Sequence, residues 1–140
     1  MGTRSMIAMQ LEDGSIRSVY SHWDGYLSHN GKILLENYSD PKKVEALLNE
    51  GNISSLGENI GEKHDFNGDR PEGQTTFYMR DRGESNQEAV VAKNEKKFWK
   101  DMDGGFCEFF YLFRDGKWLY SEGEKNFKEL TAEACKEVVE

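Results

Sequence analysis

The sequence predicts an α+β fold: a mainly antiparallel sheet of about five strands, built from two hairpins and one further strand, with helices packed on it. The chain has 140 residues, of which 36% are hydrophobic and 12% aromatic, so residues 1–140 can build the core of a single domain. Two segments place strand-forming residues on both sides of an Asp-Gly turn. Several others carry helix-start residues or apolar residues at helical spacing.

The first hairpin is expected over residues 4–23. Ile7, Met9 and Leu11 alternate with polar or small residues, as in a strand that buries one face. Asp13-Gly14 then supplies a turn that tolerates positive φ, and the return strand follows.

Two helices are expected next. Residues 30–38 favour a short helix, and a second helix begins at Asp40, which caps it, with Pro41 in the first position. Gly51 ends this helix. One face of it is apolar, at the spacing i, i+3, i+4: Val44, Leu47 and Leu48.

The middle of the chain is polar and rich in glycine. Residues 52–75 are predicted to form a long loop, and loops of this length in compact domains are functional or mobile. A strand over 75–81 and a helix over 86–100 are expected to follow.

The clearest hairpin covers residues 106–122, with its turn at Asp115-Gly116. Its first strand, FCEFFYLF, is apolar on both faces, so either helices cover both sides or one face packs on a partner. A homodimer is therefore a further expectation. Thr131 is expected to cap a final helix with Val138 on its apolar face.

The charge and the cysteines exclude several classes. With 18 basic and 26 acidic residues the net charge is −8, which argues against direct binding to a nucleic-acid backbone, allows an acidic nucleic-acid mimic, and is most simply explained by solubility. Cys107 and Cys135 lack ligand spacing, as do the three histidines, so no metal or cofactor is expected. No apolar run is long enough to span a membrane, and a reducing cytoplasm is the simplest compartment.

The segment His22-Trp23-Asp24-Gly25-Tyr26 is the most unusual in the chain. A turn at a strand end could present His22 and Asp24 as an acid–base pair, with Trp23 or Tyr26 stacking on a ligand. The structural alternative makes Asp24-Gly25 a turn, buries Trp23 and ties His22 to a backbone carbonyl. The structural interpretation is slightly favoured.

Arg80, Arg82 and Glu84 bring two guanidinium groups and a carboxylate together at an expected strand end. Arg4 would join them if the first strand lies beside this one. Arginine contacts phosphate and carboxylate through two parallel hydrogen bonds, which predicts an anion-binding cluster. A salt-bridge network among the same residues, including Asp81, is an equally good interpretation.

Three stretches carry a family resemblance: Gly2-Thr3-Arg4-Ser5, the segment 22–26, and residues 80–84 (RDRGE). Together they resemble a group of small tailed-phage and prophage proteins in which these segments recur in the same order. The resemblance implies a phage-encoded protein in the host cytoplasm. Small accessory phage proteins often block host machinery, so it also implies such a role, by association.

These observations lead to one main functional expectation: a protein that neutralises a host factor, a component of antiviral defence, by stoichiometric binding of a protein or of a nucleotide-like ligand. Eight residues are the candidates for the binding site: Arg4, His22, Trp23, Asp24, Tyr26, Arg80, Arg82 and Glu84. The alternatives are a small hydrolase or lyase that uses His22 and Asp24, and an acidic nucleic-acid mimic.

Overall fold

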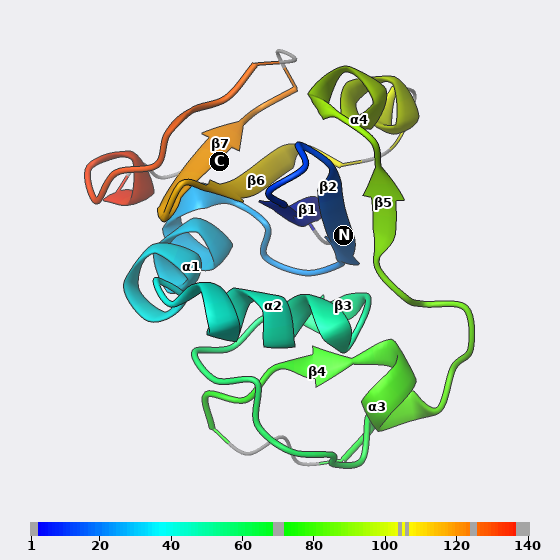
Figure 1. The fold of residues 1–140 in the computed structure, drawn as a ribbon. Coiled ribbons are helices and arrows are strands. Elements are labelled where there is room, and N and C mark those ends of the chain that lie inside the picture. The colour runs from blue at the N-terminus through cyan, green and yellow to red at the C-terminus, as the bar shows by residue number, and fades with distance from the viewer. Residues whose placement is uncertain (1–2, 69–71, 104, 106, 124–125, 137–140) are drawn as a thin grey trace.

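The computed structural model describes residues 3–68, 72–103, 105, 107–123 and 126–136. Its centre is an eight-stranded sheet in the order β4-β3-β2-β1-β6-β7-β8, with β5 paired to β2 beside that path (Figure 1). The strands are β1 (Ser5–Gln10), β2 (Ile16–Ser21), β3 (Ile53–Ser55), β4 (Thr76–Phe77), β5 (Val90–Ala92), β6 (Phe109–Arg114), β7 (Lys117–Ser121) and β8 (Lys128–Glu129). The helical elements are η1 (Leu27–Gly31), α1 (Lys32–Asn37), α2 (Pro41–Asn49), α3 (Tyr78–Arg82), α4 (Glu95–Met102) and η2 (Ala134–Lys136).

The α+β class is confirmed, but the expected five-stranded, mainly antiparallel sheet is wrong. The sheet is mixed, because β1 runs parallel to β6 and β2 runs parallel to β3. The extra strands β3, β5 and β8 are two or three residues long, too short for an alternating pattern. Strand-forming residues and turn residues predict each hairpin, but they carry no information on how two hairpins distant in sequence pair with each other.

Both predicted hairpins are present, with the expected turns. Ser5 pairs with Ser21 at one end of β1–β2, and Gly14 takes φ 87° in the turn. In the β6–β7 hairpin, Asp115 has φ 54° and Gly116 has φ 76°. Two successive residues of positive φ match the twist of the flanking strands, and this is why Asp-Gly is favoured there.

Two of the other expected elements have different bounds in the structure: the strand ends early, and the helix begins late. Instead of a strand over 75–81, β4 ends at Phe77, whose N–H donates to the Asp81 carboxylate, and the chain enters α3. Instead of a helix over 86–100, β5 is followed by α4. The Asn94 side chain caps α4 by accepting the Lys97 N–H. A hydrogen-bonding side chain at a helix start thus overrides the local pattern in both places.

The helices at the start and the end of the chain agree in part with expectation. Asp40 caps α2 and Pro41 is its first residue, as predicted. Thr131 accepts the Ala134 N–H, but the turn that follows is the short 3-10 helix η2, and Val138 lies outside the described residues. No helix in the described part of the chain is long and apolar enough to cross a membrane.

Helices cover both faces of the central hairpins. On one face, Phe109, Tyr111 and Phe113 pack with residues of α1 and α2. On the other, Phe110 and Leu112 pack with Phe98 and Trp99 of α4. The doubly apolar β6 is therefore explained within one chain, and its composition needs no second copy.

Candidate functional site

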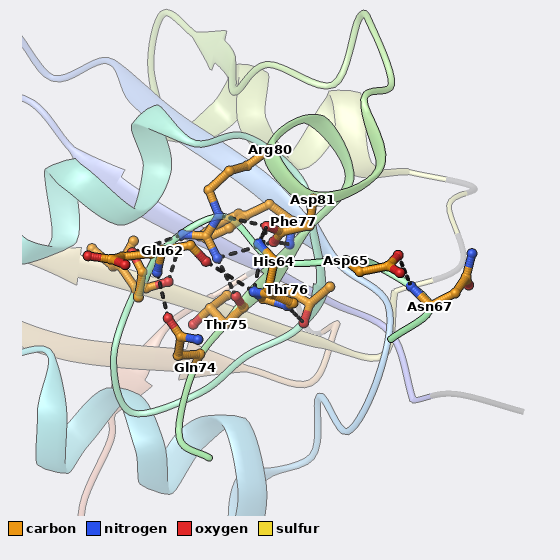
Figure 2. A network of polar contacts seen from close by, with 12 residues as sticks. Glu62, His64, Asp65, Asn67, Gln74, Thr75, Thr76, Phe77, Arg80 and Asp81 are labelled. Carbon is orange, nitrogen blue, oxygen red and sulfur yellow. Dashed lines mark hydrogen bonds and ion pairs between the residues drawn. The ribbon is translucent and has the colours of Figure 1, made fainter. Parts of the chain in front are cut away.

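Arg80 holds the long loop that precedes β4 (Figure 2). Its Nε donates to Asp81 Oδ1 at 3.0 Å, and one Nη2 hydrogen goes to Oδ2 at 3.1 Å. The other three hydrogens go to main-chain carbonyls: Ile60 at 2.8 Å, Gly61 at 3.1 Å and Thr75 at 2.7 Å. A guanidinium has five N–H donors, so these contacts use all of them. The Arg80 side chain is 10% exposed and has no donor left for an anion.

Asp81 is the acceptor at the centre of this network. Its fully buried carboxylate also accepts the N–H groups of Phe77 at 2.8 Å and His64 at 3.0 Å. Burial raises the pKa of Asp81, but the hydrogen bonds from Arg80, Phe77 and His64 lower it by more, so the net pKa lies below the usual value. Asp81 therefore stays ionised inside the protein, where the positive charge of Arg80 balances its negative charge.

His64 completes the loop anchor. Its Nδ1 lies 3.0 Å from the Glu62 carbonyl, and its Nε2 lies 3.0 Å from the Thr76 hydroxyl. The Asp81 carboxylate is 3.6 Å from Nδ1, too long for a hydrogen bond. Sequence reasoning missed this contribution because His64 and Thr76 are twelve residues apart in a segment without periodicity.

Arg82 and Glu84 behave differently from Arg80. They form an ion pair of 3.1 Å at the surface, where 53% of the Arg82 side chain is exposed. The Arg82 guanidinium also lies 5.0 Å from the centre of the Phe66 ring and 5.9 Å from that of Tyr78. In the RDRGE segment, Arg80 therefore makes buried contacts within the protein, and Arg82 makes contacts at the surface.

The backbone of residues 22–26 is hydrogen-bonded to β3 and to the segment that precedes β1. The N–H groups of His22 and Trp23 donate to the carbonyls of Ile53 and Ser54, each at 3.0 Å. Gly25 donates to the Thr3 carbonyl at 2.7 Å, and a Cβ on Gly25 would lie 2.7 Å from that same oxygen. Only glycine allows this approach of the two chain segments.

The side chains of this turn do not pair as the sequence suggested. His22 Nδ1 lies 2.7 Å from the hydroxyl of Tyr20, whereas Asp24 accepts a hydrogen bond of 3.3 Å from Tyr26. His22 also contacts Trp23 edge to face, with 4.6 Å between the ring centres. Trp23 itself is 42% exposed, so it is a surface residue and not the core residue of the structural alternative.

Arg4 lies close enough to these side chains to influence their protonation. Burial lowers the pKa of His22, and the positive charge of Arg4 lowers it further. Burial raises the pKa of Tyr20, against the effect of Arg4, and raises that of Cys107 to about 11. His22 is therefore neutral at pH 7, where its ring can hydrogen-bond to Tyr20 beside a fixed cation.

The predicted residues thus fall into separate groups. We call Arg4, Tyr20, His22 and Trp23 the Trp23 surface, in which the charge of Arg4 acts on Tyr20 and His22; Asp24 and Tyr26 lie next to it in sequence. Tyr20 was missed as a site residue, although residues two apart on a strand share a face, which pairs it with His22. Arg80 belongs to the loop anchor, and Arg82 with Glu84 to the exposed ion pair.

Within the described ranges, no group of three or more His, Cys, Asp or Glu side chains is placed to hold a metal ion. A cavity of about 390 Å³ lies between α1 and η2, and none of the predicted site residues lines it. Comparison with known proteins found no matching family model, no matching curated protein and no matching solved structure.

Proposed function

We propose that this protein acts by stoichiometric binding of another protein, and that the Trp23 surface is the anchor of the contact. The observation that carries the proposal is the exposed indole of Trp23, 42% accessible, on a backbone fixed at both ends. Exposing so large an aromatic group to water is unfavourable, and contact with a partner would remove that cost.

The composition of the surface supports a protein partner. Trp, Tyr and Arg are the residues most enriched among those that dominate binding energy in protein interfaces. Here the ring of His22 supports Trp23, and Tyr20 in turn holds His22. A side chain that is already ordered loses little conformational entropy on binding, so more of the contact energy contributes to affinity.

The same contacts make two alternatives less favourable. An acid–base enzyme using His22 would need Asp24 or Glu84 to orient the imidazole, but Asp24 is bonded to Tyr26 and Glu84 is paired with Arg82. A nucleotide-binding site would need free guanidinium donors, and those of Arg80 are occupied by the protein's own loop. The resemblance to tailed-phage proteins is what suggests that the partner is a host protein of antiviral defence.

The test uses native mass spectrometry of the tagged protein after incubation in bacterial lysate. Trp23→Ala is compared with Leu11→Ala, because Leu11 is exposed to a similar degree, 37%, in the β1–β2 turn. The wild type and Leu11→Ala are expected to retain one protein at fixed stoichiometry. Losing about 2 kcal/mol at an interface anchor weakens binding about 30-fold, so Trp23→Ala is expected to lose that protein.

Two results would contradict the proposal. Equal retention by Trp23→Ala and Leu11→Ala would place the contact elsewhere on the molecule. A bound mass of a few hundred daltons in place of a protein would support the nucleotide-like ligand, and its chemical conversion would support an enzyme.

A further inference from the structure

The edge strand β5 is open on one side. It pairs antiparallel with β2, with Val91 opposite Arg17, and no other strand in the described part of the chain pairs with it (Figure 1). An edge strand presents unpaired N–H and C=O groups, and proteins usually protect such an edge with charges, proline or a covering segment. Here the first two residues are Val90 and Val91, which are 56% and 62% exposed.

We infer that β5 is the contact through which two copies of this chain pair, edge to edge and antiparallel. Successive residues of a strand point to opposite faces, so Val90 and Val91 leave apolar surface on both sides of the sheet. A second strand placed alongside would satisfy the open backbone groups and cover both valines together. Such a closed, two-fold contact is the commonest kind between identical chains.

The charges of the segment favour a second copy in the antiparallel direction. Residues 87–93 contain one acid, Glu88, near the start and one base, Lys93, at the end, so the segment is neutral in a chain of net charge −8. Glu88 and Lys93 are an odd number of residues apart, so their side chains point to opposite faces and do not pair directly. Antiparallel pairing nevertheless keeps like charges apart, whereas in-register parallel pairing would set each charge beside its own copy. The segment can therefore pair with its own copy without opposing like charges.

Symmetry and the neighbouring helix select the register. Opposite residues of an antiparallel pair point to the same face, so a two-fold axis must pass between one residue and its own copy. An axis at Val90 pairs Val91 with Ala89 and Gln87 with Lys93, and leaves Asn94, which caps α4, outside the paired strands. An axis at Val91 would bring Gln87 opposite Glu95, the first residue of α4.

This arrangement has a consequence for the binding surface. A two-fold axis perpendicular to the sheet keeps equivalent faces of both copies on the same side. Tyr20 packs against the cluster that α4 covers, and His22 is bonded to Tyr20. Two Trp23 surfaces would therefore flank one extended sheet on its α4 side, and a partner with repeated epitopes would gain avidity.

Sedimentation velocity on the full chain, from about 5 µM to about 500 µM, tests the pairing. Because β5 is only three residues long, the wild type is expected to dimerise in the upper part of this range. Val90→Lys and Val91→Lys are each expected to raise the dissociation constant at least about tenfold, because charge at an edge opposes pairing. Leu11→Lys is the control at an exposed apolar residue outside β5.

Cysteine cross-linking tests the register. Opposite residues lie about 4.5–5.5 Å apart between Cα atoms, within disulfide range, so mild oxidation is expected to link Val90→Cys to its copy. In this register the two copies of residue 91 would be roughly 8 Å apart, beyond that range. Val91→Cys should therefore give no more cross-linked dimer than the wild type. The wild type sets the background because it has its own free thiols, Cys107 and Cys135.

Three results would overturn the inference. A wild type that remains monomeric at the highest concentration would exclude the second copy and leave the edge to an extended segment of another protein. A dimer unaffected by either lysine would place the contact elsewhere. Cross-linking of Val91→Cys without Val90→Cys would overturn the register.

Discussion

Replacing Arg80 tests whether the loop anchor is structural. Arg80→Met keeps most of the aliphatic length but removes five hydrogen bonds, two to Asp81 and three to loop carbonyls. It also leaves the fully buried Asp81 carboxylate without its cation. Breaking a buried ion pair from one side costs about 3–5 kcal/mol, so we expect Arg80→Met to lose about that much free energy of unfolding. This is a large fraction of the roughly 5–15 kcal/mol typical of domains.

The assay is urea denaturation followed by tryptophan emission, with Arg82→Met as the matched control two residues away. Arg82 makes only an exposed ion pair and stacking contacts, so its replacement should cost less than about 1 kcal/mol. Arg80→Lys keeps the positive charge but loses the planar set of five donors. Its loss of free energy of unfolding should lie between those of Arg80→Met and Arg82→Met. Equal and small effects of Arg80→Met and Arg82→Met would refute the internal anchor.

Three further predictions concern the surface around Trp23. Iodide should quench Trp23 but not Trp99 or Trp118, which are 8% and 3% exposed, so Trp23→Phe should abolish most of the quenching. Because the folded pKa of His22 lies below its unfolded value of about 6.5, its contribution to stability is complete above that pH and is lost as the pH falls through the folded pKa. As the pH is lowered, the thermal unfolding temperature of His22→Gln should therefore drop less steeply than that of the wild type. Gly25→Ala should cost about 1–3 kcal/mol in urea denaturation, since its Cβ would meet the Thr3 carbonyl at 2.7 Å; an unchanged midpoint would contradict this.

Local chemistry made several elements predictable. Asp-Gly turns determined both hairpins, and Asp40 with Pro41 located the start of α2. The errors at α3 and α4 arose where a hydrogen-bonding side chain overrides the periodic pattern. Asp81 turns the chain into α3 by accepting the N–H of Phe77, and Asn94 caps α4 by accepting that of Lys97. The carboxylate of Asp81 also accepts the N–H of His64, which is distant in sequence. Hydrophobic periodicity does not record such contacts.

The candidate site was predictable to a similar extent. In the 22–26 segment Asp24 takes a positive φ of 56°, but Trp23 is exposed, whereas the favoured structural interpretation had buried it. The prediction that His22 pairs with Asp24 was wrong, because His22 bonds to Tyr20 instead. The alternating side-chain directions of β2 continue as far as residue 22, so Tyr20 and His22 lie on the same face. Arg80 was equally well described by two interpretations in the sequence. Its three carbonyl acceptors, which decide between them, are backbone atoms and leave no trace in residue types.

The central claim is that Trp23 lies in the contact with a partner protein. The most direct measurement is iodide quenching of tryptophan emission, before and after saturating the protein with the partner recovered from lysate. The partner would be used with its own tryptophans replaced. Because Trp23 is the one exposed tryptophan of the three in the chain, quenching by iodide should largely disappear in the complex. Undiminished quenching in a saturated complex would show that Trp23 remains in water and would contradict the account.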